Sequence, residues 1–196
     1  MRIFCKMDQK TIPHRRKCCF FDRDGVANVE VDYLHEAEKT VLEAGFVEAV
    51  KAAHANGYLA VIITNQAGIA RGMFSLQELY QVHERIQELL AEQGEKIDAI
   101  YFCPHHPDYT GVCNCRKPAP GMILKAAEEL NIDLAQSLMI GDRLSDCQCG
   151  KNAGCKASYL VRTGYGLKTL TANPDPGFPV ADNSYAAFMD FLKNQE

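Results

Sequence analysis

The chain has 196 residues, of which 47% are hydrophobic and 23% charged, and its net charge is −4. This composition predicts one well-packed domain over residues 1–196 and argues against extended disorder. The acidic balance provides no field for nucleic acid, no apolar run is long enough to span a membrane, and Met1–Lys17 lacks the apolar stretch of a signal peptide. We therefore expect a cytoplasmic protein, taken as a monomer, that binds neither nucleic acid nor membranes.

Short apolar segments alternate with helical patterns along the chain, which is typical of an α/β fold with a parallel sheet. The apolar segments are nearly uninterrupted, and this predicts strands that helices cover on both faces. The predicted strands are Cys18–Phe21, Leu59–Ile63, Ile97–Phe102, Leu138–Ile140 and Ser158–Val161.

Helix-ending and helix-starting residues predict the helices between these strands. Gly57 is a helix-ending residue, and Ser75 with Glu78 forms a capping box that starts a helix. Three prolines and a glycine make residues 171–179 a predicted loop. The predicted helices are Glu43–Asn56, Ser75 to about Glu92, Pro120–Asn131 and Ser184–Lys193.

Acidic and hydroxyl side chains come directly after the predicted strands. Asp22 and Asp24 come after the first strand, Thr64 after the second and Asp142 after the fourth. In open parallel sheets, ligands bind beyond the carboxyl ends of the strands, so we expect these groups to meet in one crevice. Residues 22–25 alone also fit an ordinary turn, whereas an EF-hand calcium loop is excluded because residues 25–27 provide no ligand side chains.

Further segments complete a set of motifs: Ile62–Gln66, Arg116–Pro118 and Gly141–Asp146. Together with Asp22–Gly25, they resemble the motifs of the haloacid dehalogenase superfamily, in the same order, over about residues 18–166. The resemblance implies a three-layer, Rossmann-like α/β fold with a parallel sheet, and a magnesium-dependent phosphatase. Predicted elements already fill the spans between the motifs, so we expect no large cap domain.

The resemblance also assigns roles that the chemistry of phosphate esters explains. Asp22 would form an aspartyl-phosphate, and Asp24 would act as general acid and base. A phosphate dianion repels a carboxylate, so magnesium held by Asp22, Asp142 and the backbone carbonyl of Asp24 would neutralise the encounter. Asp146 is expected to orient these ligands or to cap the following helix. The transferring phosphoryl oxygens would be held by Thr64 and Lys117.

Residues 103–115 combine a Cys-x-His pair with a Cys-x-Cys pair around a turn. Three sulfurs and one imidazole would make a closed, structural zinc site, with Cys103, His105, Cys113 and Cys115 as ligands. His106 is the alternative imidazole, and we favour His105 because its spacing resembles the family pattern. The remaining cysteines, Cys5 among them, are predicted to be ordinary thiols.

This loop, followed by Arg116-Lys117-Pro118, is similar to the heptose bisphosphate phosphatases and to the related histidinol-phosphate phosphatases. We favour the first family, which implies removal of the C7 phosphate of D-glycero-D-manno-heptose 1,7-bisphosphate on the route to nucleotide-activated heptose for lipopolysaccharide or surface glycans. The alternatives are a histidinol-phosphate phosphatase of histidine biosynthesis and a non-catalytic binding protein on the same fold. The implied substrate contacts are Glu30, Val31, Asp32, Tyr33, Asn65, Gln66, Ala67, Arg116 and Arg143.

Residues 30–32 and Arg143 depart from the pattern of that family, and we expect the departures to affect sugar selectivity without touching the chemistry. In the absence of a cap, the zinc loop and residues 30–33 would shape the pocket.

Overall fold

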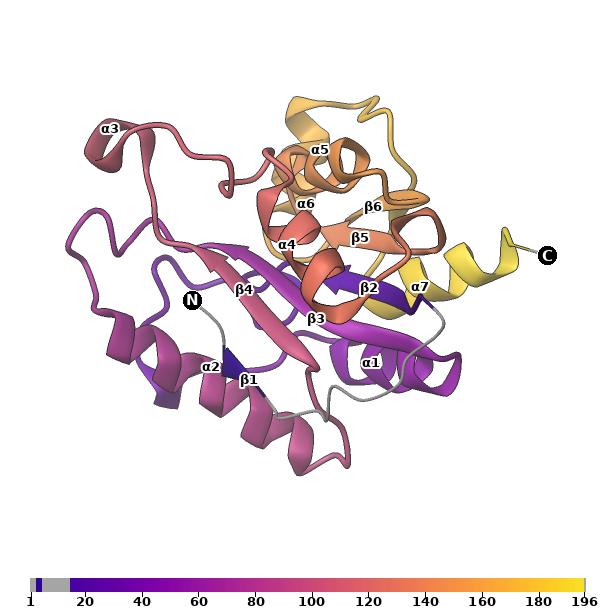
Figure 1. Ribbon diagram of the computed structural model, residues 1–196, viewed down its shortest axis with the longest axis horizontal. Coiled ribbons are helices and arrows are strands. Elements are labelled where there is room, and N and C mark those ends of the chain that lie inside the picture. The colour runs from indigo at the N-terminus through magenta and orange to yellow at the C-terminus, as the bar shows by residue number, and fades with distance from the viewer. Residues whose placement is uncertain (1–2, 5–14, 196) are drawn as a thin grey trace.

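The computed structural model describes residues 3–4 and 15–195, so Cys5 and most of Met1–Lys17 lie outside the described residues. Its strands form one sheet in the order β1-β4-β3-β2-β5-β6-β7 (Figure 1). All neighbouring strands are parallel except β1, which pairs antiparallel with β4. The strands are β1 Ile3–Phe4, β2 Lys17–Phe21, β3 Tyr58–Asn65, β4 Ala99–Cys103, β5 Leu138–Gly141, β6 Ala157–Val161 and β7 Val180–Ala181.

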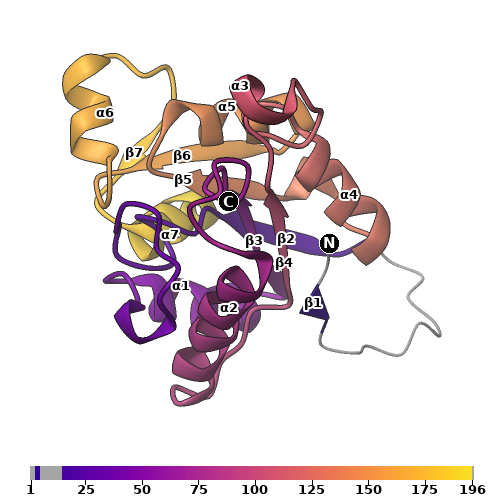
Figure 2. The ribbon, with the colours of Figure 1, turned by 90° about the vertical axis from the view of Figure 1, so that its left-hand side faces the viewer.

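Helices cover both faces of this sheet, and successive residues of a strand contribute to opposite cores. On β2, Cys19 and Phe21 pack into the core on one face, with α1, α2 and α7, whereas Cys18 and Phe20 pack into the core on the other, with α4 and α5. Figure 2 shows the sheet between these two layers. The helices are α1 Phe46–Ala55, α2 Leu76–Ala91, α3 Pro107–Thr110, α4 Gly121–Leu130, α5 Leu144–Ala153, α6 Gly166–Ala172 and α7 Ser184–Lys193, with short 3₁₀ turns at Ala37–Lys39 and Leu134–Gln136.

The predicted three-layer α/β fold is therefore confirmed, and every predicted strand and helix is present, α7 with the predicted bounds and the others with shifted ends. The first helix begins at Phe46 and not at Glu43, because Gly45 adopts a left-handed conformation with φ of 84° that is incompatible with a helical turn. The third predicted strand begins at Ala99, because the backbone of Ile97 is bonded instead to the side chain of Gln87 in α2.

Other departures involve short elements. Residues 171–172 belong to α6 and are not part of the predicted loop. The strands β1 and β7 have two residues each, which is too short to produce a periodic pattern, and the helix α3 has four. Among residues 3–4 and 15–195, no helix combines the length and apolarity needed to cross a membrane.

β2 lies between β3 and β5, and the chain reaches these two neighbours across opposite faces of the sheet. The chain reaches β3 through α1 on one face, and it reaches β5 through α4 on the other. The carboxyl end of β2 therefore lies at a point where the winding of the sheet reverses, which is where open α/β sheets bind ligands. The register places Phe21 beside Ile62 of β3 and Ile140 of β5, so Asp22 follows at the centre of this edge.

Candidate active site

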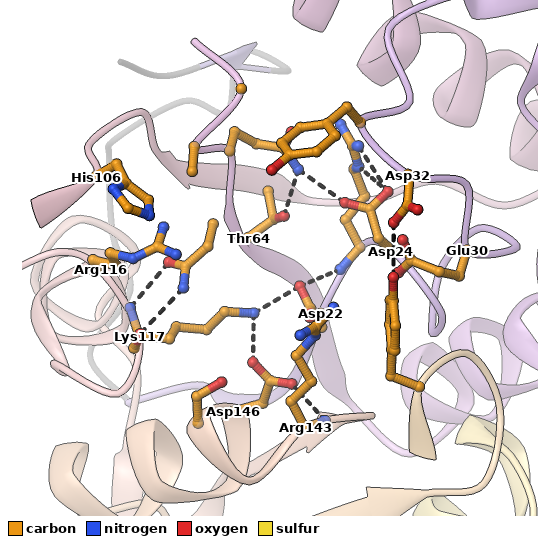
Figure 3. Close-up of a pocket in the computed structure, with 18 of the residues that line it drawn as sticks. Asp22, Asp24, Glu30, Asp32, Thr64, His106, Arg116, Lys117, Arg143 and Asp146 are labelled. Atoms are coloured by element: carbon orange, nitrogen blue, oxygen red, sulfur yellow. Dashed lines mark hydrogen bonds and ion pairs between the residues drawn. The ribbon is translucent and has the colours of Figure 1, made fainter. Parts of the chain in front are cut away.

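A cavity of about 460 Å³ opens at the carboxyl ends of β2 and β3 (Figure 3). Every predicted catalytic residue lines it, and so does every predicted substrate contact except Val31, whose side chain is 37% exposed and does not line the cavity. Its lining residues are Asp22, Arg23, Asp24, Glu30, Asp32, Tyr33, Thr64, Asn65, Gln66, Ala67, Gly68, Arg71, His106, Arg116, Lys117, Arg143, Ser145, Asp146 and Tyr165.

Lys117 is buried at the floor of this cavity between two carboxylates. Its Nζ lies 2.6 Å from Oδ1 of Asp22 and 2.8 Å from Oδ1 of Asp146, and it donates to the carbonyl of Ile63 at 2.9 Å. Burial alone would lower the pKa of Lys117, but Asp146 and Asp22 together raise it above its usual value. The lysine therefore stays positively charged.

Asp22, Asp142 and Asp146 form a cluster of buried carboxylates whose ligand atoms lie within 4.8 Å of one another. Burial raises the pKa of Asp22 to about 7 and, together with repulsion from Asp22, that of Asp142 to about 8. Oδ1 of Asp142 is buried without a hydrogen-bond partner among the described residues. Oxygen ligands that repel one another and leave a buried oxygen unpaired fit a hard divalent cation.

The other oxygens of this cluster decide which carboxylates are available to a cation. Asp146 uses both of its oxygens, one for Lys117 and one to accept from the backbone N–H of Arg143 at 3.0 Å at the start of α5. This arrangement fits the helix-capping role expected for Asp146 and leaves Asp22 and Asp142 as the better ligands.

Two glycines make room for Asp142. A Cβ added at Gly25 would lie 2.3 Å from Oδ2 of Asp142, and one at Gly164 would lie 2.4 Å from the same oxygen. That oxygen accepts from the backbone N–H of Tyr165 at 2.7 Å. The glycines of these two loops therefore let backbone pack directly against the carboxylate cluster.

Asp24 is held by a network on both of its oxygens. Arg23 donates to Oδ1 through Nε at 3.0 Å and Nη2 at 2.7 Å, and Asn28 donates to the same oxygen at 3.2 Å. Oδ2 accepts from Nε2 of Gln66 at 3.0 Å, and this amide also donates to the Thr64 hydroxyl at 2.8 Å. The Asp24 carboxylate and the Thr64 hydroxyl are therefore linked across the cavity by one amide group.

Asn65 connects two of the motifs through the backbone of Lys117. Its amide donates to the Lys117 carbonyl at 3.1 Å, and its side-chain oxygen accepts from the Lys117 N–H at 3.0 Å. This two-bond contact fixes the segment that carries the buried lysine to the end of β3, so Asn65 acts through Lys117 as well as lining the cavity.

Residues 103–115 bring together the predicted zinc ligands, and Figure 1 shows this segment projecting from the end of β4. The three sulfurs lie 3.2–3.6 Å apart, and Nδ1 of His105 lies 3.3 Å from Cys115 Sγ and 3.7 Å from Cys103 Sγ. Ligands at ~2.3 Å from a tetrahedral zinc ion would lie about 3.8 Å apart, so the cluster approaches that geometry. His106 points elsewhere, because its Nε2 contacts Arg71 at 3.0 Å.

The rim of the cavity is built from long side chains on separate loops. The Arg143 guanidinium lies 4.0 Å from the centre of the Tyr165 ring, and the Tyr165 hydroxyl donates to Asp32 at 2.7 Å. Burial and the charge of Asp24 raise the pKa of Glu30 to about 7. Arg116 donates to the carbonyl of His105 at 3.2 Å.

The sequence motifs did not single out Arg23, Arg71, Ser145 or Tyr165 as site residues. Arg23 is the variable residue between the two motif aspartates, yet it is 1% exposed and pairs with Asp24. Tyr165 stands between two glycines in the segment that follows β6. Because β6 belongs to the same parallel sheet, a residue beyond its carboxyl end could have been predicted to lie near the site.

Comparisons with known proteins agree with this geometry. Residues 114–187 match a family model described as HAD-hydrolase-like. The D-glycero-beta-D-manno-heptose-1,7-bisphosphate 7-phosphatase of Pasteurella multocida is 45% identical over 153 residues, which cover 76% of this chain and 83% of that protein. The enzyme of the same name from Yersinia pestis is 42% identical over 89% of this chain and 94% of its own length. The chain belongs to the heptose bisphosphate phosphatase family.

Solved structures place the chain in this family as well. The D,D-heptose 1,7-bisphosphate phosphatase of B. bronchiseptica, complexed with magnesium and phosphate, superposes with a TM-score of 0.82 and 36% identity over 91% of this chain and 99% of that one. The corresponding protein of Burkholderia thailandensis has a TM-score of 0.67 and 34% identity.

Proposed function

We propose that this chain hydrolyses the C7 phosphate of D-glycero-D-manno-heptose 1,7-bisphosphate through an aspartyl-phosphate intermediate. The observation that carries the proposal is the floor of the cavity, where the buried Asp22 lies 2.6 Å from the charged Lys117 and beside Asp142. Family membership supports the choice of substrate, since relatives 38–45% identical are named as phosphatases of this bisphosphate. The product would enter the synthesis of nucleotide-activated heptose.

The floor residues divide the reaction between them. Oδ1 of Asp22 already accepts from Lys117 and from the backbone N–H of Arg23 at 2.7 Å, so Oδ2 keeps a free lone pair for attack or metal binding. Nζ of Lys117 and the Thr64 hydroxyl would bind oxygens of the transferring phosphoryl group, where negative charge is spread in the transition state. The phosphate ester would therefore sit above these groups with its leaving oxygen turned toward Asp24.

Asp24 would serve both halves of the reaction. Asp24 lines the cavity, and its carboxyl group can protonate the leaving sugar oxygen, then take a proton from the water that hydrolyses the aspartyl-phosphate. Gln66 and Arg23 would hold the carboxyl group in position during both transfers, since they bond to its two oxygens. General acid–base catalysis of this kind contributes roughly 10²–10⁴-fold.

Magnesium would be held by Asp22, Asp142 and the backbone carbonyl of Asp24. When bound, it would neutralise charge on the phosphoryl oxygens and the attacking carboxylate. The unpaired, buried Oδ1 of Asp142 supports this ligand set. A related enzyme was crystallised with magnesium and phosphate.

Zinc would be held by Cys103, His105, Cys113 and Cys115 as a closed structural site. Its function would be to fix the loop that carries His106 and leads directly into Arg116 and Lys117. The close approach of the three sulfurs and one ring nitrogen supports this proposal. The expectations of a single domain, a monomer, a cytoplasmic location and no nucleic-acid partner stay predictions.

A substrate panel tests the proposed function. The wild-type protein should hydrolyse D-glycero-D-manno-heptose 1,7-bisphosphate with a kcat/KM well above that for the corresponding 7-phosphate and for histidinol phosphate, and only with a divalent cation present. Faster turnover of histidinol phosphate would move the chain to the alternative enzyme class. No turnover of any phosphate ester with magnesium would instead favour a binding protein.

A further inference from the structure

Arg71 lies at the mouth of the cavity and contacts both loops that border it. It follows β3, and its Nη1 donates to the Tyr33 hydroxyl at 2.8 Å while its Nη2 contacts Nε2 of His106 at 3.0 Å. Its guanidinium also lies 5.8 Å and 5.7 Å from the ring centres of Tyr33 and Tyr109. One arginine thus joins the substrate loop to the zinc loop.

Contacts at both ring nitrogens hold His106. Its Nε2 lies 3.0 Å from Nη2 of Arg71, which can only donate, and its Nδ1 lies 3.3 Å from the backbone nitrogen of Asp108 and 3.7 Å from a carboxylate oxygen of the same residue. The Tyr33 hydroxyl likewise accepts from Arg71, and Tyr33 itself is held in a left-handed conformation with φ of 55°, which is unusual for a bulky residue. Arg71 is therefore held by hydrogen bonds to side chains of two separate loops.

The charge of Arg71 is left without a counter-ion. Among the described residues, no carboxylate lies within ion-pair distance of it, whereas Lys117 pairs with two aspartates. A guanidinium has five N–H donors, and the two bonds to Tyr33 and His106 leave three of them for a ligand. An arginine held between aromatic rings with free donors facing a cavity is suited to a phosphate.

The two sides of the cavity differ in charge, and this difference indicates where a second phosphate group of the substrate would bind. Figure 3 shows His106 and Arg116 on one side, with Glu30 and Asp32 on the other and Lys117 and Asp22 between them. Arg71 contacts His106 and also the Tyr33 hydroxyl, so its guanidinium lies between the His106 side and the loop 30–33. A second phosphate on the substrate would be repelled by Glu30 and Asp32 and attracted to Arg71 and Arg116.

We propose that Arg71 is a specificity-determining residue that binds the phosphate that is not transferred, while Tyr33 and His106 hold its guanidinium in the wall of the cavity. This inference rests on the proposed function, because it requires a substrate with two phosphate groups. It also gives the loop 30–33 a positioning role, since Tyr33 acts on the ligand through Arg71.

The test compares two substrates in matched variants. Arg71→Gln removes the charge and keeps a polar side chain, and Arg85→Gln is the control, because Arg85 is a partly exposed arginine on α2 that pairs with Glu88 and does not line the cavity. For each protein, kcat/KM is measured on D-glycero-D-manno-heptose 1,7-bisphosphate and on p-nitrophenyl phosphate. Arg71→Gln should lower the ratio of the two values by about 10–100-fold, mainly through the KM of the bisphosphate, and Arg85→Gln should leave the ratio unchanged.

Tyr33→Phe tests the positioning of Arg71 without removing the charge of Arg71. It keeps the ring and removes the hydroxyl that accepts from Arg71, so the ratio should fall in the same direction but less than in Arg71→Gln. A wild-type enzyme that prefers the bisphosphate, together with an Arg71→Gln ratio within twofold of wild type, would overturn the role of Arg71 and leave the proposed function standing. A wild-type enzyme with no preference for the bisphosphate over p-nitrophenyl phosphate would overturn both.

Discussion

The floor and the rim of the cavity differ in the burial and in the pairing of their charged side chains. At the floor, Asp22, Lys117 and Asp146 are buried, charged and paired with one another over 2.6–2.8 Å. At the rim, Arg71 and Arg143 are exposed and contact a tyrosine hydroxyl, a histidine ring and aromatic rings instead of carboxylates. Charges with buried partners are fixed before any substrate arrives, whereas the rim charges keep donors for a ligand.

This difference assigns separate tasks to the two regions. The floor provides groups that act on any phosphate ester, because they contact only the phosphoryl group. The rim is formed by segments 30–33, 66–75 and 103–116 together with Arg143 and Tyr165, and its groups can contact only the remainder of the substrate. Variants of the floor should therefore reduce turnover of all substrates equally, and variants of the rim should change the choice among substrates.

The largest effect is expected for Asp22→Asn. The amide is nearly isosteric and can still accept from Lys117, but it cannot attack phosphorus, so turnover should fall by at least about 10⁴-fold on every substrate. Steady-state assays with magnesium on the bisphosphate and on p-nitrophenyl phosphate, alongside circular dichroism to show retained folding, measure this. Near-wild-type turnover would contradict the covalent mechanism.

The next largest effect is expected for Cys113→Ala, which tests the zinc site in the loop 103–115 of the rim. Removing one thiolate should release the metal and lower the free energy of unfolding by at least about 3 kcal/mol, because metal binding and folding of such a site are coupled. Elemental analysis should give one zinc per wild-type chain and none in the variant. Ser145→Ala, which also changes a cavity residue but no metal ligand, should keep its zinc. A zinc-free wild-type protein prepared without chelator would contradict the site.

Arg116→Ala should produce a smaller effect that depends on the substrate. Its guanidinium donates to the carbonyl of His105 through Nη1, so a ligand can use its other donors. Losing a charged hydrogen bond to the remote phosphate would cost ~1.5–3 kcal/mol in kcat/KM. A monophosphate such as p-nitrophenyl phosphate should lose much less. Equal losses on both substrates would mean that Arg116 only braces the zinc loop.

The contrast between floor and rim also explains which parts of the site could be predicted from the sequence. The floor residues come directly after buried strands, and parallel topology brings the carboxyl ends of those strands together, so Asp22, Thr64 and Asp142 were predicted from position alone. The choice of His105 over His106 followed from the resemblance of the Cys-x-His spacing to the family pattern, and the structure directs His106 to Arg71 instead.

The rim could not be predicted in the same way, because its geometry depends on loops whose paths follow no period. Tyr165 and Arg71 reach the cavity from loops after β6 and β3, and their partners lie on other loops. Val31 was included because it lies within the segment 30–33, yet its side chain turns to solvent between neighbours that line the cavity. Residue-level predictions are therefore sound where a strand sets the direction of a side chain and weaker where a loop does.

The smallest effect expected is a gain in the stability of the metal-free protein when Asp142 is replaced by asparagine. This gain measures how far the buried carboxylates of the floor destabilise the fold. Burial, with repulsion from Asp22, raises the pKa of Asp142 to about 8, so the folded protein binds a proton there more tightly than the unfolded chain does. The ionised group therefore destabilises the fold increasingly as the pH rises from about 4, its unfolded pKa, toward 8. Asp142→Asn removes that charge and can keep the bond from the Tyr165 N–H.

Without divalent cations at pH 8, Asp142→Asn should consequently raise the melting temperature by ~2–4 °C, which corresponds to about 1 kcal/mol for a chain of this size. The gain should shrink as the pH is lowered toward 5, where wild-type Asp142 is protonated in the folded protein. Saturating magnesium should reverse the order, because wild-type protein gains stability from binding the cation and the variant does not. Thermal unfolding at both pH values, with Arg71→Gln as a rim control that shows no such pH dependence, makes the comparison. A lower melting temperature for Asp142→Asn in metal-free buffer at pH 8 would show that the carboxylates of the floor do not repel one another as their burial implies.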